Sequence, residues 1–179
     1  MIKVGIAGVG GIGSNVAVQL VRAGYTSLKL VDFDRVELSN MNRQFYFNHQ
    51  IGGYKVDMLR DNLLGIVPDG KVETERVRLT AKNMQGMFND CQVLVEGLDE
   101  EQSKKLLVET FADRDIPIVS ASGIAGRRMD TIRTCRLGNC TIVGDFQTDF
   151  RSHILYGPKV AVIAAIMADL VIKQGGCND

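Results

Sequence analysis

Residues 8–13 read GVGGIG, and they follow directly on the apolar run IKVGIA at 2–7. The apolar run indicates a buried strand, and the spacing of apolar residues over 12–23 indicates a helix. A glycine-rich turn between a strand and a helix lets backbone N–H groups and the positive end of the helix dipole approach a phosphate. The sequence therefore predicts a nucleotide site on this turn. Its expected ligands there are Gly8, Gly10, Gly11 and Gly13.

Strand-like and helical runs continue to alternate beyond the glycine turn. The expected strands are 28–33, 72–77, 92–95 and 116–121, and the expected helices are 55–66, 81–88 and 100–113. Strands separated by helices favour right-handed crossovers and a mainly parallel sheet. After Gly126, the runs 127–135 and 140–145 flank a turn signal and indicate a β-hairpin, followed by an apolar helix over 160–173. We expect a single domain over 1–179 with a Rossmann-like, doubly wound α/β fold and a C-terminal β-hairpin and helix.

Composition excludes several classes of protein. Lys+Arg and Asp+Glu balance at 21 each, so no global field favours nucleic acid or an anionic membrane. The apolar stretch over 160–172 is shorter than the roughly 20 residues that span a bilayer. Because Met1 leads directly into a strand-like run and the 4 cysteines are few, we expect a cytoplasmic protein without a signal peptide. We expect neither a nucleic-acid nor a membrane partner.

The segment after the second expected strand carries an unusual density of polar residues. Residues 32–44 read DFDRVELSNMNRQ. Asp32 stands where a carboxylate can accept hydrogen bonds from ribose hydroxyls, and the alternative is a chance acid after a glycine-rich turn. Ordinary dinucleotide binding needs no cation at Arg43. This segment therefore favours chemistry on a phosphate over hydride transfer.

Three motifs together resemble the ThiF/MoeB/HesA family of ATP-dependent adenylyltransferases, which are related to ubiquitin-activating enzymes. They are GVGGIGS at 8–14, the DFD and SNMNRQ run within 32–44, and GYK at 53–55. The resemblance extends from residue 2 to the last helix and is greatest to short ThiF-like members of thiamine biosynthesis. It implies ATP-dependent activation of the C-terminal carboxylate of a small ubiquitin-like sulfur carrier protein. It also implies a homodimer, which the apolar 160–173 helix favours independently.

The resemblance also implies roles for individual residues. Asp32 matches the ribose ligand, Lys55 matches a phosphate-binding lysine, and Asp99 matches a magnesium-binding aspartate. The other nucleotide ligands expected in this region are Asp34, Asn40, Arg43 and Gln44. Attack of a carboxylate on the α-phosphate brings two anions together and expels pyrophosphate, so fixed cations and Mg²⁺ stabilise the transition state. We therefore expect Arg43, Lys55 and Asp99 to be the catalytic residues.

Each of these residues has an ordinary structural alternative. Arg43 and Lys55 resemble solvated surface cations when taken singly. Asp99 is placed to cap the helix expected over 100–113, and Asn40 is placed to support a turn. Their order behind a glycine turn favours the functional interpretation.

The chain departs from the family pattern in three respects. Family members carry an N-terminal helical segment with an arginine that reaches a partner's active site, whereas Met1 of this chain is followed at once by the first expected strand. Arg127 and Arg128 are candidates to replace that arginine. The alternative is that both are solvated hairpin arginines. The cysteines do not have the spacing of the family's two zinc-binding Cys-x-x-Cys pairs. Cys135 and Cys140 are separated by four residues, and the other possible ligands, His153 and Cys177, stand alone in the sequence. The segment 146–157 has no cysteine for a covalent step, and Cys140 is a weak substitute.

Two rival functions remain open from the sequence. An NAD-dependent oxidoreductase would share the glycine turn and Asp32, but it leaves Arg43, Gln44 and Lys55 without a role. A non-catalytic nucleotide-binding scaffold is favoured by the missing N-terminal arginine and the missing cysteine. The sequence thus predicts an adenylyltransferase, with these two classes as alternatives.

Overall fold

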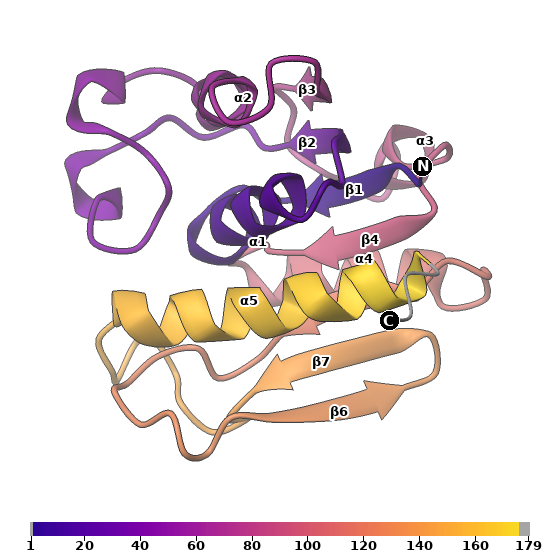
Figure 1. The fold of residues 1–179 in the computed structure, drawn as a ribbon. Coiled ribbons are helices and arrows are strands. Elements are labelled where there is room, and N and C mark those ends of the chain that lie inside the picture. Colours follow the sequence, from indigo (N-terminus) through magenta and orange to yellow (C-terminus); the bar gives the residue numbers. More distant parts are fainter. Residues whose placement is uncertain (1, 176–179) are drawn as a thin grey trace.

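The computed structural model describes residues 2–175 and confirms the expected α/β class. Its sheet has seven strands in the order β3-β2-β1-β4-β5-β7-β6 (Figure 1). All neighbouring strands are parallel except the β6–β7 hairpin. The strands are β1 (Val4–Ala7), β2 (Ser27–Val31), β3 (Lys71–Glu75), β4 (Val93–Glu96), β5 (Ile118–Ala121), β6 (Arg133–Leu137) and β7 (Cys140–Gly144).

The strand order reverses beside β1, which pairs with β2 on one side and β4 on the other. Val4 is in register with Leu28 of β2 and Val93 of β4. In open α/β sheets, ligands bind at such a reversal, in the crevice beyond the carboxyl ends of the strands. The glycine turn leaves β1 at this end of the sheet, so the topology places it where a nucleotide would bind.

Helices cover both faces of the sheet. They are α1 (Gly11–Arg22), α2 (Lys55–Leu64), α3 (Met84–Met87), α4 (Glu101–Phe111) and α5 (Gly157–Gln174), with single 3₁₀ turns at Leu38–Asn40 and Asn48–Gln50. Side chains of a strand alternate between the two faces. Val93 and Val95 of β4 accordingly pack with α1, α2 and α5, whereas Leu94 between them packs with Phe88 and Phe111 beside α3 and α4. Figure 1 shows α1 and α5 side by side on one face.

Two expected elements differ from the structure in extent. The helix expected over 81–88 is shortened to α3, because the Asn83 side chain accepts a hydrogen bond from the Thr80 N–H at 2.7 Å and forms a turn before it. The first hairpin strand begins at Arg133, so Arg127 and Arg128 lie in the preceding loop and are not hairpin residues. The Asn83 contact is a local polar one, which apolar periodicity does not reveal.

One face of the C-terminal helix α5 is buried within the chain. Val160, Ile163, Met167 and Val171 are inaccessible to solvent and belong to the core shared with α1. Val162 on the outer side is 39% exposed. The apolar character of α5 is therefore largely explained by packing inside the chain. Across residues 2–175, the structure contains no helix with the length and apolar character needed to cross a membrane.

A buried ion pair closes the fold beneath the first turn of α5. Lys159 Nζ lies 2.6 Å from Asp145 Oδ2. Burial by itself would raise the pKa of Asp145, but hydrogen bonds from Lys159 and from the Gln147 and Thr148 N–H groups outweigh burial and hold that pKa well below its usual range. A carboxyl whose pKa is lowered by folding stabilises the fold above its unfolded pKa of about 3.9, and this contribution is lost as pH falls through the folded-state pKa.

We expect the Asp145→Asn variant to lose stability in a pH-dependent manner. The gap in free energy of unfolding between wild type and variant should be full at pH 7 and should shrink below about pH 4, where the wild-type carboxyl begins to be protonated in the unfolded chain. Denaturant titrations at several pH values measure this gap. A gap that is constant from neutral pH to strongly acidic pH would contradict the assignment.

Candidate nucleotide and acceptor site

The glycine turn needs glycine at particular positions for steric reasons. Gly8 has φ +81, and a Cβ there would lie 2.7 Å from the carbonyl oxygen of Gly97. A Cβ at Gly13 would overlap the carbonyl oxygen of Gly8, well inside van der Waals contact. The Gly8 N–H donates to Val31 O at 2.9 Å. The turn is therefore packed between α1 and the end of β4, and its shape is fixed by backbone.

The first turn of α1 is open towards the polar segment. Gly10 is the N-cap residue and provides no side-chain hydrogen bond to the helix. A Cβ at Gly10 would meet one neighbour within 4 Å, Gln44 Nε2 at 3.8 Å, and a Cβ at Gly11 would meet Arg43 Cγ at 3.7 Å. N–H groups in the first turn of a helix have no partner within the helix, so they are available to an anion placed here.

Asp32 follows β2 and supports this turn from below. Its Oδ2 accepts from the Val9 N–H at 2.8 Å, and its Oδ1 accepts from the Asp34 N–H at 2.9 Å. Burial raises the pKa of Asp32, although these two N–H groups and the nearby Lys55 favour the charged form. Each carboxylate oxygen has two lone pairs. Asp32 therefore fixes the glycine turn and keeps lone pairs for further donors.

Side chains of α1 hold the polar segment against the glycine turn. Asn15 Nδ2 donates to Gly11 O at 2.7 Å and to Arg43 O at 2.8 Å, so one amide joins the two segments. Ser14 Oγ accepts from the Phe45 N–H at 3.0 Å. These contacts place the side chain of Arg43 near the start of α1.

Tyr46 is a second anchor for the turn. Its buried hydroxyl donates to Val9 O at 2.6 Å. Burial, with a smaller contribution from the carboxylates of Asp32 and Asp34, raises the pKa of the Tyr46 hydroxyl, which keeps it protonated and able to donate. Sequence reasoning missed Tyr46, Asn15 and Ser14. A tyrosine two residues after Gln44 and polar residues inside an otherwise apolar helix were the available signals.

A cavity of about 300 Å³, here called the polar cavity, brings together most of the polar residues expected from the sequence. Its lining residues are Asp34, Arg35, Glu37, Ser39, Asn40, Arg43, Gln44, Lys55 and Asp99. The glycines and Asp32 stand beside it and do not line it. The polar side chains that were expected to contact phosphate or magnesium thus share one cavity, and the glycine turn lies next to it.

Two cations with different environments face this cavity. Lys55 is 7% exposed, and its Nζ lies 2.8 Å from Asp34 Oδ2, so it is not a solvated surface lysine. Arg43 is half-buried and donates from Nη1 to Ser39 O at 2.9 Å and to Asn42 Oδ1 at 2.8 Å. Neither acceptor is charged, and burial lowers the pKa of Arg43. Arg43 has no carboxylate partner among residues 2–175, so its charge remains available to an anion.

The side-chain oxygen of Gln44 is an unsatisfied acceptor. Gln44 Oε1 is buried and has no hydrogen-bond partner within the described part of the chain. Leaving a buried acceptor unpaired costs about 1–3 kcal/mol. Since Gln44 lines the polar cavity, a ligand that carries hydrogen-bond donors would remove this cost.

The structure decides between the functional and the purely structural interpretations of Asp99 and Asn40. Helix α4 has Glu100 as its N-cap and lacks a side-chain cap, so the interpretation of Asp99 as the capping residue is wrong. Asn40 does support a turn, because its Oδ1 accepts from the Glu37 N–H at 3.0 Å. Asp99 is exposed and its carboxylate has no hydrogen bond or ion pair with residues 2–175. Asp99 is therefore free to bind a cation.

The polar cavity fits magnesium only together with substrate phosphates. Asp34, Glu37 and Asp99 place three carboxylates on its lining, but no group of three or more His, Cys, Asp or Glu residues within 2–175 is arranged as a metal site. Mg²⁺ is commonly bound by one or two carboxylates, water and substrate phosphates. The donor set is consistent with that arrangement.

The cysteines take positions that do not favour covalent chemistry. Cys135 and Cys140 are confirmed as hairpin residues, on β6 and β7. Burial raises the pKa of the Cys140 thiol to about 11, so the reactive thiolate is scarce at neutral pH. Cys177, the remaining zinc candidate, lies outside the described residues.

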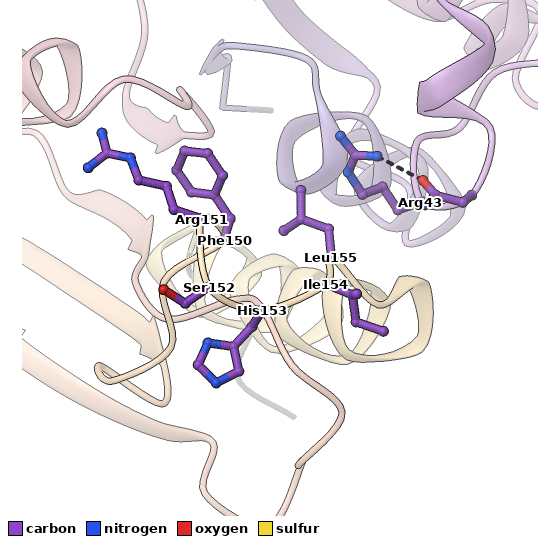
Figure 2. Close-up of a pocket in the computed structure, with 8 residues that line it drawn as sticks. Arg43, Phe150, Arg151, Ser152, His153, Ile154 and Leu155 are labelled. Carbon is purple, nitrogen blue, oxygen red and sulfur yellow. Dashed lines mark hydrogen bonds between the residues drawn. The ribbon is translucent and has the colours of Figure 1, made fainter.

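A second cavity of about 530 Å³, here called the loop cavity, opens next to the first. It is lined by Asn42, Arg43 and the loop residues Phe150, Arg151, Ser152, His153, Ile154 and Leu155 (Figure 2). Figure 2 shows Leu155 on the side facing Arg43, whereas Arg151 extends away from it. Arg43 lines both cavities, so this residue lies at their junction.

Arg127 and Arg128 do not approach this junction. The guanidinium of Arg127 stacks on the ring of Tyr156 at 5.7 Å, and Arg128 forms an exposed ion pair with Asp130 at 2.9 Å. Neither of them lines the polar cavity or the loop cavity.

Comparisons with known proteins identify the family. The ThiF family model matches residues 1–174. The chain is 42% identical over 85 residues to ubiquitin-like modifier-activating enzyme 5 of Caenorhabditis briggsae, covering 48% of this chain and 20% of that protein. It is 33% identical over 123 residues to adenylyltransferase and sulfurtransferase uba4 of Aspergillus fumigatus, covering 68% of this chain and 25% of that protein. The chain thus spans about a fifth to a quarter of these curated relatives.

Solved structures agree on the fold. The E. coli tRNA N6-threonylcarbamoyladenosine dehydratase TcdA in complex with AMP superposes with a TM-score of 0.88 at 19% identity, covering 98% of this chain and 86% of that one. E. coli MccB with AMPCPP and MccA gives a TM-score of 0.79 at 20% identity, covering 98% and 56%. At these identities the likeness concerns the fold. Because the family model covers nearly the whole chain, the protein belongs to the ThiF family.

Proposed function

We propose that residues 1–179 form one ATP-binding domain that adenylates a carboxylate. The observation that carries this proposal is the position of Arg43 between the polar cavity and the loop cavity. A reaction that joins two anionic substrates needs a cation where they meet. In this proposal ATP phosphates occupy the polar cavity, and the acceptor carboxylate enters through the loop cavity.

The proposed chemistry is an in-line displacement at the α-phosphate. A carboxylate oxygen of the acceptor forms a bond to the α-phosphorus while the bond to the bridging oxygen of the β-phosphate breaks. The products are an acyl-adenylate and pyrophosphate, and the bridging electron pair leaves with pyrophosphate. Arg43 stabilises charge on the α-phosphate, and its planar guanidinium suits a forked contact with two oxygens.

The remaining residues bind and orient ATP in this proposal. The N–H groups at Gly10, Gly11 and the start of α1 face the phosphates, and Asp32 accepts from ribose hydroxyls. Lys55 is the second phosphate-binding cation, and Asn40 and Gln44 offer hydrogen bonds. Asp99, with Asp34 beside it, would hold Mg²⁺, which when bound neutralises charge on the departing pyrophosphate.

The acceptor we favour is the C-terminal carboxylate of a small ubiquitin-like sulfur carrier, of the kind used in thiamine biosynthesis. Two observations support this choice. Relatives over part of the chain are named ubiquitin-like modifier-activating enzyme 5 and adenylyltransferase and sulfurtransferase uba4. The loop cavity is also large enough for a short extended peptide. A homodimer in the cytoplasm is part of the same proposal.

Two rivals make different predictions. An NAD-dependent oxidoreductase would bind a nicotinamide dinucleotide in place of ATP, which a fluorescence titration with NADH measures. A non-catalytic scaffold would bind ATP and turn over no acceptor. Family membership and the cations in the polar cavity both favour adenylation over hydride transfer.

The Lys55→Met variant should bind ATP more weakly. A charge-assisted hydrogen bond contributes about 1.5–3 kcal/mol, so we expect the Kd for ATP to rise roughly 10- to 100-fold. Calorimetric titration with ATP and Mg²⁺ measures this change. The matched control is Lys173→Met, which removes an exposed lysine in the last turn of α5. Equal Kd values for wild type and Lys55→Met would contradict the assignment.

Exchange of labelled pyrophosphate into ATP tests the proposed reaction. The acceptor is a purified sulfur carrier that ends in Gly-Gly, and the control is the same carrier with its terminal carboxylate converted to an amide. Exchange with the free carboxylate and none with the amide is the expected result. Exchange that is independent of the carboxylate would overturn the proposal, and ATP binding without exchange for any carrier would favour the scaffold.

A further inference from the structure

A fully buried lysine lies outside the proposed chemistry. Lys159 is 0% exposed and belongs to the first turn of α5, and its ion-pair partner Asp145 is 3% exposed. Neither residue lines the polar cavity or the loop cavity. The two residues come from different elements, because Asp145 directly follows β7.

This placement is energetically unfavourable for a lysine. The first turn of a helix carries the positive end of the helix dipole, which opposes a cation there. Removing two charges from water costs several kcal/mol for each ion, so a buried ion pair often contributes no net stability relative to apolar residues. A gain in stability over an apolar pair is therefore a poor explanation for Lys159, although breaking the pair would be costly. The contacts made by the pair offer a better explanation.

The ion pair joins three segments. Lys159 Nζ donates to Ala125 O in the loop after β5, at 2.5 Å, as well as to Asp145. Asp145 Oδ1 accepts from the Gln147 N–H at 2.8 Å and from the Thr148 N–H at 2.9 Å. A Cβ at Gly123 would overlap the Asp145 carboxylate, so this loop approaches the pair with bare backbone. The carboxylate thus fixes the chain at the point where it leaves β7.

The same contacts define the wall of the loop cavity. The cavity residues 150–155 run from the segment held by Asp145 to the start of α5. Near the end of this run, Ile154 O accepts a hydrogen bond from the Gly126 N–H at 2.8 Å. The loop after β5 therefore also supports this wall. At its far end, a Cβ on Gly157 would lie 2.5 Å from Asn42 O, which shows how closely α5 abuts the segment that carries Arg43.

We propose that Lys159 and Asp145 are positioning residues for the acceptor: their ion pair holds residues 147–155 in the shape that lines the loop cavity, and ATP binding does not depend on it. The inference rests on the proposed function in assigning the loop cavity to the acceptor. The physical reason is that Lys159, which is fixed in α5, holds in one position the carboxylate that accepts from both backbone N–H groups.

A double variant tests the inference, because the single substitution of Lys159 leaves one buried charge without its partner. Lys159→Met removes the cation but leaves a buried carboxylate, which can destabilise the whole chain. The double variant Lys159→Met with Asp145→Asn removes both charges and leaves an acceptor oxygen, so it is expected to fold. The control is Lys173→Met, which breaks the exposed ion pair of Lys173 with Asp169 on the same helix.

Hydrogen exchange provides a readout that needs no acceptor. In the double variant, backbone amides in peptides covering 145–156 should exchange about tenfold faster or more, because their opening free energy falls. Peptides covering β1 and α1 should be unchanged, and so should the Kd for ATP. Unchanged exchange over 145–156 would overturn the inference, as would an equal increase throughout the chain.

Kinetics then separate positioning from a general structural role. With a carrier ending in Gly-Gly, the KM for the carrier should rise about tenfold or more, since small misplacements of a binding wall have large effects. The KM for ATP should stay the same. Equal changes in both KM values would overturn the inference. Absence of exchange in the wild type would overturn the proposed function alone, because hydrogen exchange tests the ion pair separately.

Discussion

The Arg43→Ala variant should lose pyrophosphate exchange by about 10²- to 10³-fold, the usual effect of removing one transition-state donor. Arg43 lines both cavities, and its guanidinium has no carboxylate partner among residues 2–175. In the proposed reaction, its charge is therefore available where the acceptor carboxylate would meet the α-phosphate. The kcat of the exchange should fall more than the Kd for ATP rises, because charge on the α-phosphate develops during the reaction.

A matched control removes an arginine without a place in the site. Arg22 lies in the last turn of α1 and is exposed, so Arg22→Ala should keep wild-type exchange. Steady-state exchange and calorimetric titration with ATP measure both quantities for each variant. If Arg43→Ala retained exchange within a few-fold of wild type, Arg43 would not be the cation at the reaction centre.

The Gly13→Ala variant should be strongly destabilised. Helix propensity alone predicts a gain of about 1 kcal/mol, since Gly13 lies in α1. A Cβ there would overlap Gly8 O, and Gly8 is itself held between Val31 and Gly97, so the overlap is with backbone that cannot turn aside. Overpacking in a core costs about 1–3 kcal/mol or more. We expect a net loss of at least about 2 kcal/mol in free energy of unfolding.

A glycine in open space provides the comparison. Gly86 lies in α3, and a Cβ there would find no atom within 4 Å, so Gly86→Ala should match or slightly exceed the wild-type stability. For a chain of this size, 1 kcal/mol corresponds to a change in Tm of about 2–4 °C. Thermal unfolding measures the Tm of both variants relative to wild type, and we expect a lower Tm for Gly13→Ala alone. A Gly13→Ala variant as stable as wild type would show that the turn can relax.

The sequence predicted the fold well because strong local patterns decide it. The apolar strands flanked by helical runs led to the parallel sheet, and the glycine turn was placed correctly at the end of β1. The predicted extents of α3 and β6 were wrong. At α3, a short-range polar contact of Asn83 replaces a turn of helix, and apolar periodicity carries no information about such contacts.

The site was predicted only in part, and the reason is again physical. Arg43, Gln44 and Lys55 stand in recognisable motifs, and the structure gathers them in one cavity. Tyr46 and Lys159 contact Val9 and Ala125, which lie 37 and 34 residues away in sequence. The loop cavity arises from a similar encounter between residues 150–155 and Arg43. Contacts between residues that are distant in sequence can be seen only in the folded structure.

Intact mass spectrometry of the acceptor tests the central claim most directly. A sulfur carrier ending in Gly-Gly is incubated with the protein, ATP and Mg²⁺, and its mass is measured at once. We predict that the carrier gains the mass of one adenylyl group, which is AMP less one water. It should gain none when its carboxylate is amidated or when a methylene group bridges the α- and β-phosphates of ATP. Formation of ADP and phosphate with an unmodified carrier would contradict adenylation.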